Sequence, residues 1–267
     1  MKRGMLLPQP GAVRIRLGDY LIRANLPVVP KVFGHVGRAQ PPVDGGWGNV
    51  GNRTAGDCPI AGASHETQTW FWATGRPIPP FTDASGLADY SRALVAAGGL
   101  PYDPNNPATD TGLDPVVLAS WRQTVGITDA VGVVHKIGPF ASINDPDELD
   151  LAVVLFGAAA ICWVLPDSAE GQFSQGEVWD DTSAVGTGGH YTAYVGRNSA
   201  GNRQVVTWGA LQATNDAYLA KYQYPQMRGL AYLSREYLIA SGNSPEAINF
   251  AQLDEDMASF QEQGATS

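Results

Sequence analysis

Cys58 stands where the character of the sequence changes, and that position could activate its thiol. The residues before it, "GNRTAGD" (51–57), are irregular and rich in glycine, whereas "PIAGASHETQTWFWATG" (59–75) has a helical pattern that Pro59 can open and Gly75 can end. A helix N-terminus presents unpaired N–H groups and a partial positive charge, which stabilise a thiolate. The alternative is an ordinary buried cysteine, which is the commonest fate of a free thiol.

A nucleophilic cysteine also needs a base within ~2.6–3.2 Å, and His190 is the best candidate. His65 lies seven residues beyond Cys58, so on a continuous helix it sits ~10 Å farther along the axis and cannot reach the thiol. His35 and His135 are interpreted as structural. His190 follows "GTGG" and opens the apolar segment "HYTAYVG", where glycines let a strand approach another element closely.

Composition limits the other classes of function. The chain has 267 residues, is 44% hydrophobic and carries a formal charge of -9, which argues against binding to nucleic acid or to anionic membranes. Only a short apolar stretch precedes Pro8, so we expect no secretory signal and a cytoplasmic or virion location. The two cysteines lie far apart with no metal-ligand spacing, so we expect reduced thiols, no metal and no cofactor. Cys162, in the apolar run "AAAICWVLP", is predicted to be buried and inert.

Helical patterns come first along the chain and strand patterns second, which predicts an α+β fold with a mostly antiparallel sheet. Helices are expected over 58–75, 82–99, 114–126 and 145–157, and strands over 158–166, 190–198, 203–210 and 229–238. The turn "NSAGN" should join the second and third strands as a hairpin. We expect an extended arm over 1–50 with one short strand or hairpin in "AVRIRLGDYLI", a single domain over 51–239, and an acidic, partly helical tail over 240–267.

The order of these parts resembles the papain-like cysteine peptidase family. The resemblance covers about residues 47 to 239 and rests on "GDCPIAGASHETQTW", "TDASGLADYSRAL", "DTGLDPVVLASWRQTVGI", "ELDLAVVLFGAAAICWVLP", "GGHYTAYVG" and "VVTWGALQATNDAYLAKY". His190 lies 132 residues after Cys58, within the ~130–150 window of papain-like enzymes. The sequence of these motifs, with "GDC" and "TWG", is more similar to papain-like proteins from phages and bacteria than to papain itself.

The resemblance implies a role for each candidate site residue. Cys58 matches the nucleophile, His190 the base, and Asn52 the position of the oxyanion-hole glutamine. Trp208 matches the tryptophan that shields the histidine, and core packing explains it equally well. Alignment on "WG" places Val206 where the family has an orienting asparagine, so Thr207 is the polar residue that could orient His190 instead. Asp57, at or beside the helix N-cap, would oppose thiolate formation if it were charged.

Two functions of different classes follow. The first is a thiol hydrolase that acts on peptide or isopeptide bonds. The second is a catalytically weak or inactive papain-like fold that serves as a structural component of a larger assembly such as a phage particle. The arm and the tail are then expected to contact a protein partner outside their own domain, because no periodic pattern buries the arm's apolar residues locally.

Overall fold

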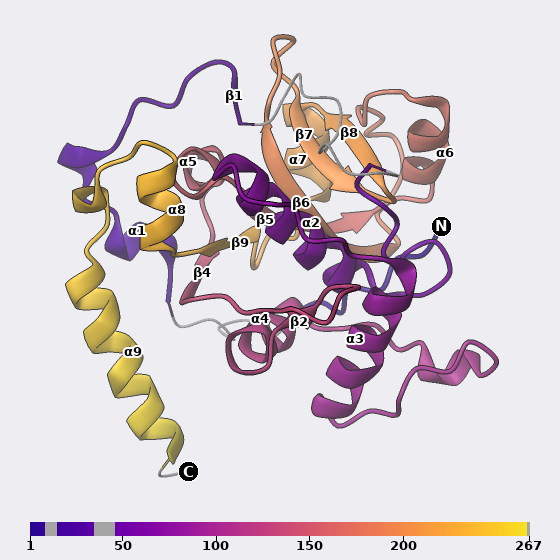
Figure 1. Ribbon diagram of the computed structural model, residues 1–267. Coiled ribbons are helices and arrows are strands. Elements are labelled where there is room, and N and C mark those ends of the chain that lie inside the picture. Colours follow the sequence, from indigo (N-terminus) through magenta and orange to yellow (C-terminus); the bar gives the residue numbers. More distant parts are fainter. Residues whose placement is uncertain (9–14, 35–45, 266–267) are drawn as a thin grey trace.

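A computed structural model describes residues 1–8, 15–34 and 46–265 and shows an α+β fold (Figure 1). The predicted helices are confirmed as α2 (Cys58–Ala73), α3 (Asp83–Ala96), α4 (Pro115–Thr124) and α5 (Pro146–Phe156). Thr82, Asp114 and Asp145 cap the last three of these helices by accepting backbone N–H groups of the first turn. The local signals therefore set the helix starts that hold the site.

The described residues form a seven-stranded antiparallel sheet in the order β4-β9-β5-β6-β7-β8, with β1 paired to β6. Its strands are β1 (Phe33–Gly34), β4 (Phe140–Ile143), β5 (Ala159–Leu165), β6 (Gly188–Arg197), β7 (Arg203–Thr207), β8 (Ala210–Thr214) and β9 (Gly229–Tyr232). The predicted hairpin joins β6 to β7. A separate pair, β2 (Ile127–Thr128) with β3 (Val134–His135), lies outside this sheet.

The sequence prediction was wrong in part of the 229–238 segment. The strand ends at Tyr232, and α8 (Arg235–Ala240) begins after Ser234, whose side chain accepts the Tyr237 N–H. The helix cap therefore overrides the β-favouring residues that follow it. The sequence analysis also missed α6 (Ser168–Gln175) and α7 (Asp216–Tyr222), which are short.

Helices α2 and α5 cover opposite faces of the sheet. Tyr191 of β6 donates to Glu66 of α2, whereas Tyr194, three residues along the same strand, donates to Asp150 of α5. Side chains of opposite parity on a strand point to opposite faces. Helix α2, which begins at Cys58, therefore packs directly against β6, the strand that contains His190.

The described part of the arm packs on the rest of the chain. Ile15, Leu17 and Tyr20 are buried in the main core, and Ile15 O accepts the Ser142 N–H. The "AVRIRLGDYLI" segment forms α1 (Leu17–Tyr20) in place of the expected strand or hairpin, and its first residues lie outside those described. The apolar side chains of the arm are buried against residues far along the chain, so no local periodic pattern is needed to bury them.

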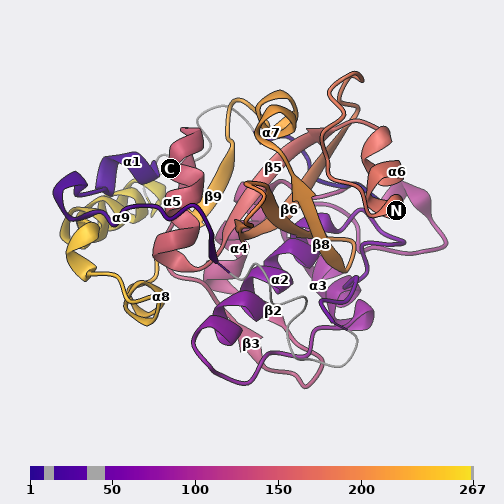
Figure 2. The ribbon, with the colours of Figure 1, turned by 90° about the horizontal axis from the view of Figure 1, so that it is seen from above.

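The tail prediction of a helix is confirmed by α9 (Phe250–Ala265). Helix α9 lies beside α1, at the opposite end of the molecule from α6 (Figures 1 and 2), and Tyr20 donates to Asp256 across that contact. Three short 3₁₀ turns complete the described elements: Arg23–Asn25, Pro107–Thr109 and Pro245–Ala247. Within the described residues, no helix has the length and apolar character needed to cross a bilayer.

Candidate active site

Cys58 is the first residue of α2, with Pro59 in the first turn, as the sequence predicted. Its side chain is buried, and Sγ accepts the Gly4 N–H at 3.2 Å. Burial raises the pKa of the thiol to about 12, although the N–H groups of Gly4, Tyr191 and Met5 act in the opposite direction. The thiol is therefore neutral at pH 7 in this state of the molecule.

Asp57 occupies the N-cap position of α2 but makes no capping hydrogen bond. The side chain is fully buried, and neither carboxyl oxygen has a hydrogen-bond partner among the described residues. Burial raises the pKa of this carboxyl well above its usual range, so the group tends to stay neutral. The opposition to thiolate formation expected from a charged Asp57 is reduced accordingly.

His190 is held by two residues of the β7–β8 hairpin. Nε2 lies 2.7 Å from Thr207 Oγ1, and the ring stacks on Trp208 with centroids 4.9 Å apart. Nδ1 is buried and has no hydrogen-bond partner among the described residues. Burial, followed by the positive charge of Arg3, lowers the pKa of His190 to about 3, so the ring is neutral at pH 7.

The turn after Thr207 explains why Trp208 reaches the histidine. Thr207 pairs with Ala210, so Trp208 and Gly209 form a two-residue hairpin turn in which both have positive φ, 46° and 83°. Positive φ is uncommon for a residue other than glycine and costs backbone energy. Val206, where the family has its asparagine, packs instead in an apolar cluster with Trp47.

Asn52 is buried, with its amide directed to backbone carbonyl groups. Nδ2 donates to Ala55 O at 3.2 Å and to Lys2 O at 3.3 Å. Lys2 O also accepts the indole N–H of Trp208 at 3.2 Å. The carbonyl group of Lys2 therefore lies between the predicted oxyanion donor and the tryptophan beside His190.

The Cys58 helix meets the His190 strand through Tyr191. A Cβ atom built on Gly62 of α2 would lie 2.4 Å from the Tyr191 ring, so only glycine permits this approach. The Tyr191 N–H is also among the groups that act on the Cys58 thiol. The residue next to His190 is thus in contact with the first turns of α2.

Residues 2–6 lie along the site as an extended segment between two walls. Met5 N–H donates to Gly189 O at 3.1 Å on the sheet side. On the helical side, Leu113 N–H donates to Gly4 O at 2.8 Å, and Leu6 N–H donates to Leu113 O at 2.9 Å. The segment therefore covers Cys58 and adds a strand-like link between the two sides.

The sequence analysis missed this covering segment. Its signal would have been a set of glycines at close approaches: Cβ atoms at positions 4, 56, 112 and 189 would all crowd the contact between the segment and its walls. No periodic pattern connects these four positions, because they lie in separate parts of the chain.

His65 and His135 each have a structural hydrogen-bond partner, and the second cysteine is buried. His65 Nε2 lies 3.0 Å from Gly48 O, and His135 Nε2 lies 2.9 Å from Asp129. Cys162 lies in β5, is fully buried and is unbridged, as is Cys58, which confirms the predicted absence of a disulfide in the structure. His35 lies outside the described residues.

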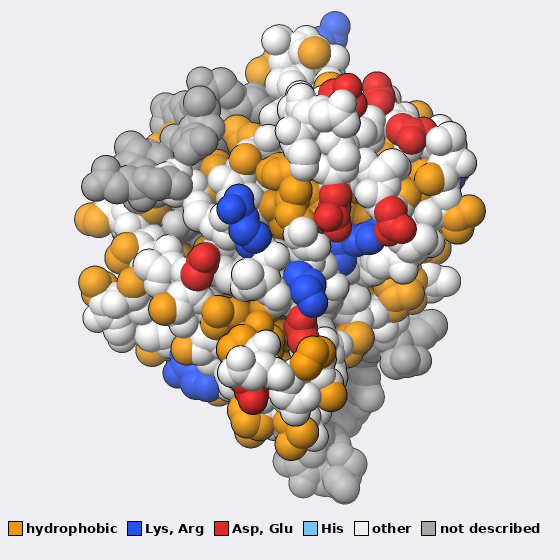
Figure 3. All heavy atoms as spheres, turned by 90° about the vertical axis from the view of Figure 1, so that its right-hand side faces the viewer, with side chains coloured by type: hydrophobic (Ala, Val, Ile, Leu, Met, Phe, Trp, Pro, Cys, Tyr) orange, Lys and Arg blue, Asp and Glu red, His pale blue; other side chains and the backbone are white. Residues whose placement is uncertain are grey.

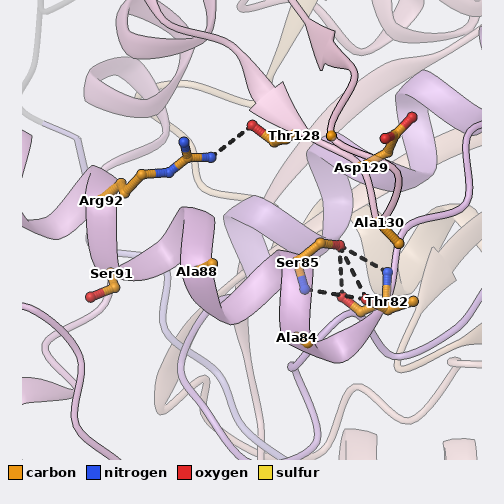
Figure 4. Close-up of a pocket in the computed structure, with 10 residues that line it drawn as sticks. Thr82, Ala84, Ser85, Ala88, Ser91, Arg92, Thr128, Asp129 and Ala130 are labelled. Carbon is orange, nitrogen blue, oxygen red and sulfur yellow. Dashed lines mark hydrogen bonds between the residues drawn. The ribbon is translucent and has the colours of Figure 1, made fainter.

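An open groove of about 690 Å³ lies away from this site (Figure 4). Its lining comes from α3 and its N-cap, and from the β2–β3 turn region, and includes neither Cys58 nor His190. Arg92 at its edge donates to Thr128, while Thr82 and Ser85 bond each other in the α3 cap. These polar groups already have partners, so the groove offers no competing catalytic set.

No family model matches the chain, and no curated protein matches it. Among solved structures, the chain is similar to xylellain, a cysteine protease from Xylella fastidiosa, with a TM-score of 0.60 and 11% identity over 87% of this chain and 96% of that one. It is also similar to proCathepsin B S9 from Trypanosoma congolense, with a TM-score of 0.56 and 10% identity over 86% of each chain. Procathepsin L 3 of Tenebrio molitor has a TM-score of 0.52 and 12% identity over 87% of this chain and 76% of that one.

These similarities show a papain-like α+β fold, as the sequence predicted. At such low identity they establish the fold alone, and the chemistry has to be argued from this chain's own residues. The roles of Cys58, His190, Asn52 and Thr207 stay predictions, and the 2.7 Å contact between His190 and Thr207 joins two of these residues directly.

Proposed function

We propose that this protein is a thiol hydrolase of peptide or isopeptide bonds, with Cys58 as nucleophile and His190 as base. The observation that carries the proposal is the state of the His190 ring. Thr207 holds Nε2 at 2.7 Å, while Nδ1 is buried and unpaired among the described residues. A ring fixed through one nitrogen, with the other nitrogen available for a proton, is what a general base requires.

The proposed chemistry proceeds through a thioester. With Nε2–H donated to Thr207, the Nδ1 lone pair takes the Cys58 proton, and the thiolate attacks the substrate carbonyl carbon. Asn52 Nδ2 and the Cys58 N–H donate to the oxyanion, and the positive end of α2 favours the negative charge. The His190 imidazolium then protonates the leaving amine, and water, deprotonated by His190, hydrolyses the thioester.

The resting molecule is latent in this proposal, because residues 2–6 occupy the cleft. Gly4 presents an N–H to Sγ at the place where a substrate presents its carbonyl carbon. The segment is therefore bound without a scissile bond in position, and the thiol pKa of about 12 reflects burial. Activity requires the segment to move aside, which removes that burial.

The test uses the full-length chain with Gly4→Val. A Cβ atom at position 4 would lie 1.7 Å from Gly56 O, so the substitution displaces the segment. We expect peptide hydrolysis, followed with a pool of fluorogenic peptides, to rise in this variant. Added Cys58→Ala should abolish it and His190→Ala should nearly do so. Turnover that survives Cys58→Ala would refute the proposal.

The alternative function is that of a structural component in a larger assembly, such as a phage particle, with protein contacts through residues 1–50 and the tail. The covered cleft and the neutral thiol favour it, since a resting site of this kind has no exposed nucleophile. Loss of assembly without loss of folding, after charge-reversing substitutions on the exposed face of α9, would support this function. Cys58-dependent turnover in the Gly4→Val chain would decide for the hydrolase.

A further inference from the structure

We propose that the pocket holding Arg3 is a subsite for a basic side chain of peptides bound in this cleft, two residues from a subsite for a large apolar side chain. This inference rests on the proposed function, because it treats residues 2–6 as occupying the place of a substrate. It adds a substrate class: peptides with a basic and a large apolar residue on either side of a small one.

Successive side chains of the covering segment contact the helical side and the sheet side of the site in turn, as in an extended strand. Lys2 contacts the helical side through Asn52 and Asp110, and Gly4 is packed on that same side against Gly56. Arg3, between them, points to the sheet side instead. This period of two is that of an extended chain, so residues 3 and 5 of any peptide in this register face the same wall.

The Arg3 pocket combines two neutral acceptors with two carboxylates. One terminal nitrogen donates to Leu165 O at 2.8 Å and to Thr187 Oγ1 at 3.2 Å, and the other pairs with Asp167. Nε lies 3.8 Å from Glu170. The Arg3 side chain is only 16% exposed, although Asp167 itself is 76% exposed, so the pair alone would contribute little in water.

Residues at the ends of two sheet strands form this pocket, so Arg3 has more partners than a surface ion pair would give it. Thr187 also donates to Asp167 at 2.7 Å, so the hydroxyl and the carboxylate are joined by a bond of which Arg3 is not a part. Leu165 ends β5, and Thr187 directly precedes β6, so the same two strands that lead to His190 position the acceptors. Acidic and basic side chains lie next to one another on the face of the molecule that carries α6 (Figure 3).

Met5 marks the second subsite. Its side chain is 4% exposed and belongs to an apolar cluster that includes Cys58, Cys162, Tyr224 and Met227. A long unbranched side chain fills such a space because it adapts to irregular walls. Between the two subsites, Gly4 leaves no room for a side chain in this register, since its Cβ would overlap Gly56 O.

The test measures binding rather than turnover, with a labelled peptide of residues 2–8 (KRGMLLP) and the full-length Gly4→Val, Cys58→Ala chain. Fluorescence anisotropy should detect binding, and replacing the peptide's arginine by alanine should weaken it about tenfold, as expected for loss of a charged hydrogen bond. In the protein, Asp167→Asn should weaken the arginine peptide but not the alanine peptide. Asp181→Asn is the matched control, because Asp181 bonds Ser183 and has no contact with Arg3.

A second measurement guards against a Gly4→Val chain that folds poorly. In the otherwise unchanged full-length protein, Arg3→Ala should raise the alkylation rate of Cys58 more than Lys2→Ala, whose partner Asp110 lies on the helical side. Equal binding of both peptides, an Asp167→Asn effect of the same size on both, or absence of binding by a folded chain would overturn the inference. Arginine-dependent binding without turnover in the Gly4→Val chain that retains Cys58 would instead leave the subsite standing and refute the hydrolase.

Discussion

The two cysteines have the same burial but owe it to different parts of the molecule. Cys58 and Cys162 belong to one apolar cluster, and burial raises the pKa of both thiols. Cys162 lies in the middle of β5, where it pairs with Tyr191 of β6, and its carbonyl oxygen accepts the Tyr224 N–H. Cys58 lies at a helix end and is covered by the segment of residues 2–6.

The two thiols therefore differ in what has to move before they are exposed. To expose Cys162, the sheet must open, which approaches global unfolding. To expose Cys58, the covering segment must leave, which breaks the few main-chain bonds to Leu113 and Gly189 together with the polar contacts of Lys2 and Arg3. Local opening of that kind costs far less than unfolding, so the two thiols should respond to different perturbations.

Arg122→Met should make Cys162 accessible by destabilising the core. Arg122 is fully buried and donates to Glu66, which also accepts the Tyr191 hydroxyl between α2 and β6. Removing one partner of a buried ion pair leaves an uncompensated charge, which costs about 3–5 kcal/mol of unfolding free energy. Urea titration measures that loss, and Cys162 alkylation should increase in proportion to the unfolded fraction.

The matched control is the double variant Arg122→Met, Glu66→Gln, which leaves no unpaired charge. It should recover a substantial part of the lost stability. A single variant as stable as the parent chain would show that this pair does not hold the core around Cys162.

Displacing the segment should change the pKa of His190 and not that of His65. Burial and the Arg3 charge lower the pKa of His190 to about 3, whereas burial lowers that of His65 to about 4 against the raising effect of its hydrogen bonds with the Gly48 and Trp47 backbone. Gly4→Val displaces the segment and so moves Arg3 and part of the covering residues away from His190. The pKa of His190 should therefore rise by at least about one unit toward 6.5. NMR titration of the ring protons measures both values, and equal shifts of the two histidines would contradict the account.

The same shifts predict the direction of acid sensitivity. Both folded-state pKa values lie below the unfolded value of about 6.5, so the unfolded chain binds more protons as the pH falls. The contribution of each histidine to stability is therefore complete above pH ~6.5 and is lost as the pH falls from there through about 4 for His65 and about 3 for His190.

Thr207→Val should have the smallest effect. It should slow the reactions of Cys58 and leave the alkylation rate of Cys162 unchanged. It removes the 2.7 Å partner of His190 Nε2, and one such hydrogen bond is worth about 0.5–1.5 kcal/mol, or about tenfold or less in rate. In the Gly4→Val background, hydrolysis and Cys58 alkylation should both slow within that limit. Thr207→Ser keeps the hydroxyl and should behave as the parent does; a valine variant with unchanged rates would remove Thr207 as the orienting residue.

Elements with local signals were predictable from the sequence. Pro59 after Cys58 and the caps at Asp114 and Asp145 gave the helix starts, and "NSAGN" gave the β6–β7 hairpin. The glycines before His190 correctly indicated a close approach, since Gly189 packs on Met5. These features depend on residues within a few positions of one another.

Features that depend on distant contacts were not predictable. The pairing of Gly4 with Leu113 joins residues more than one hundred positions apart, and no sequence pattern around either residue predicts the contact. The burial of the Asp57 carboxyl likewise depends on the packing around it. Its raised pKa could not be read from a residue that, by type, is usually charged.

The most direct test of the account is the alkylation rate of the two cysteines in one sample, resolved by mass spectrometry after iodoacetamide treatment. In the full-length parent chain both should react slowly. In the Gly4→Val chain the account predicts that Cys58 reacts at least about a hundredfold faster while Cys162 stays slow, because only Cys58 is covered by a removable segment. Equal acceleration of both cysteines, or a Cys58 that stays slow in the Gly4→Val chain, would contradict the claim that residues 2–6 cover a latent nucleophile.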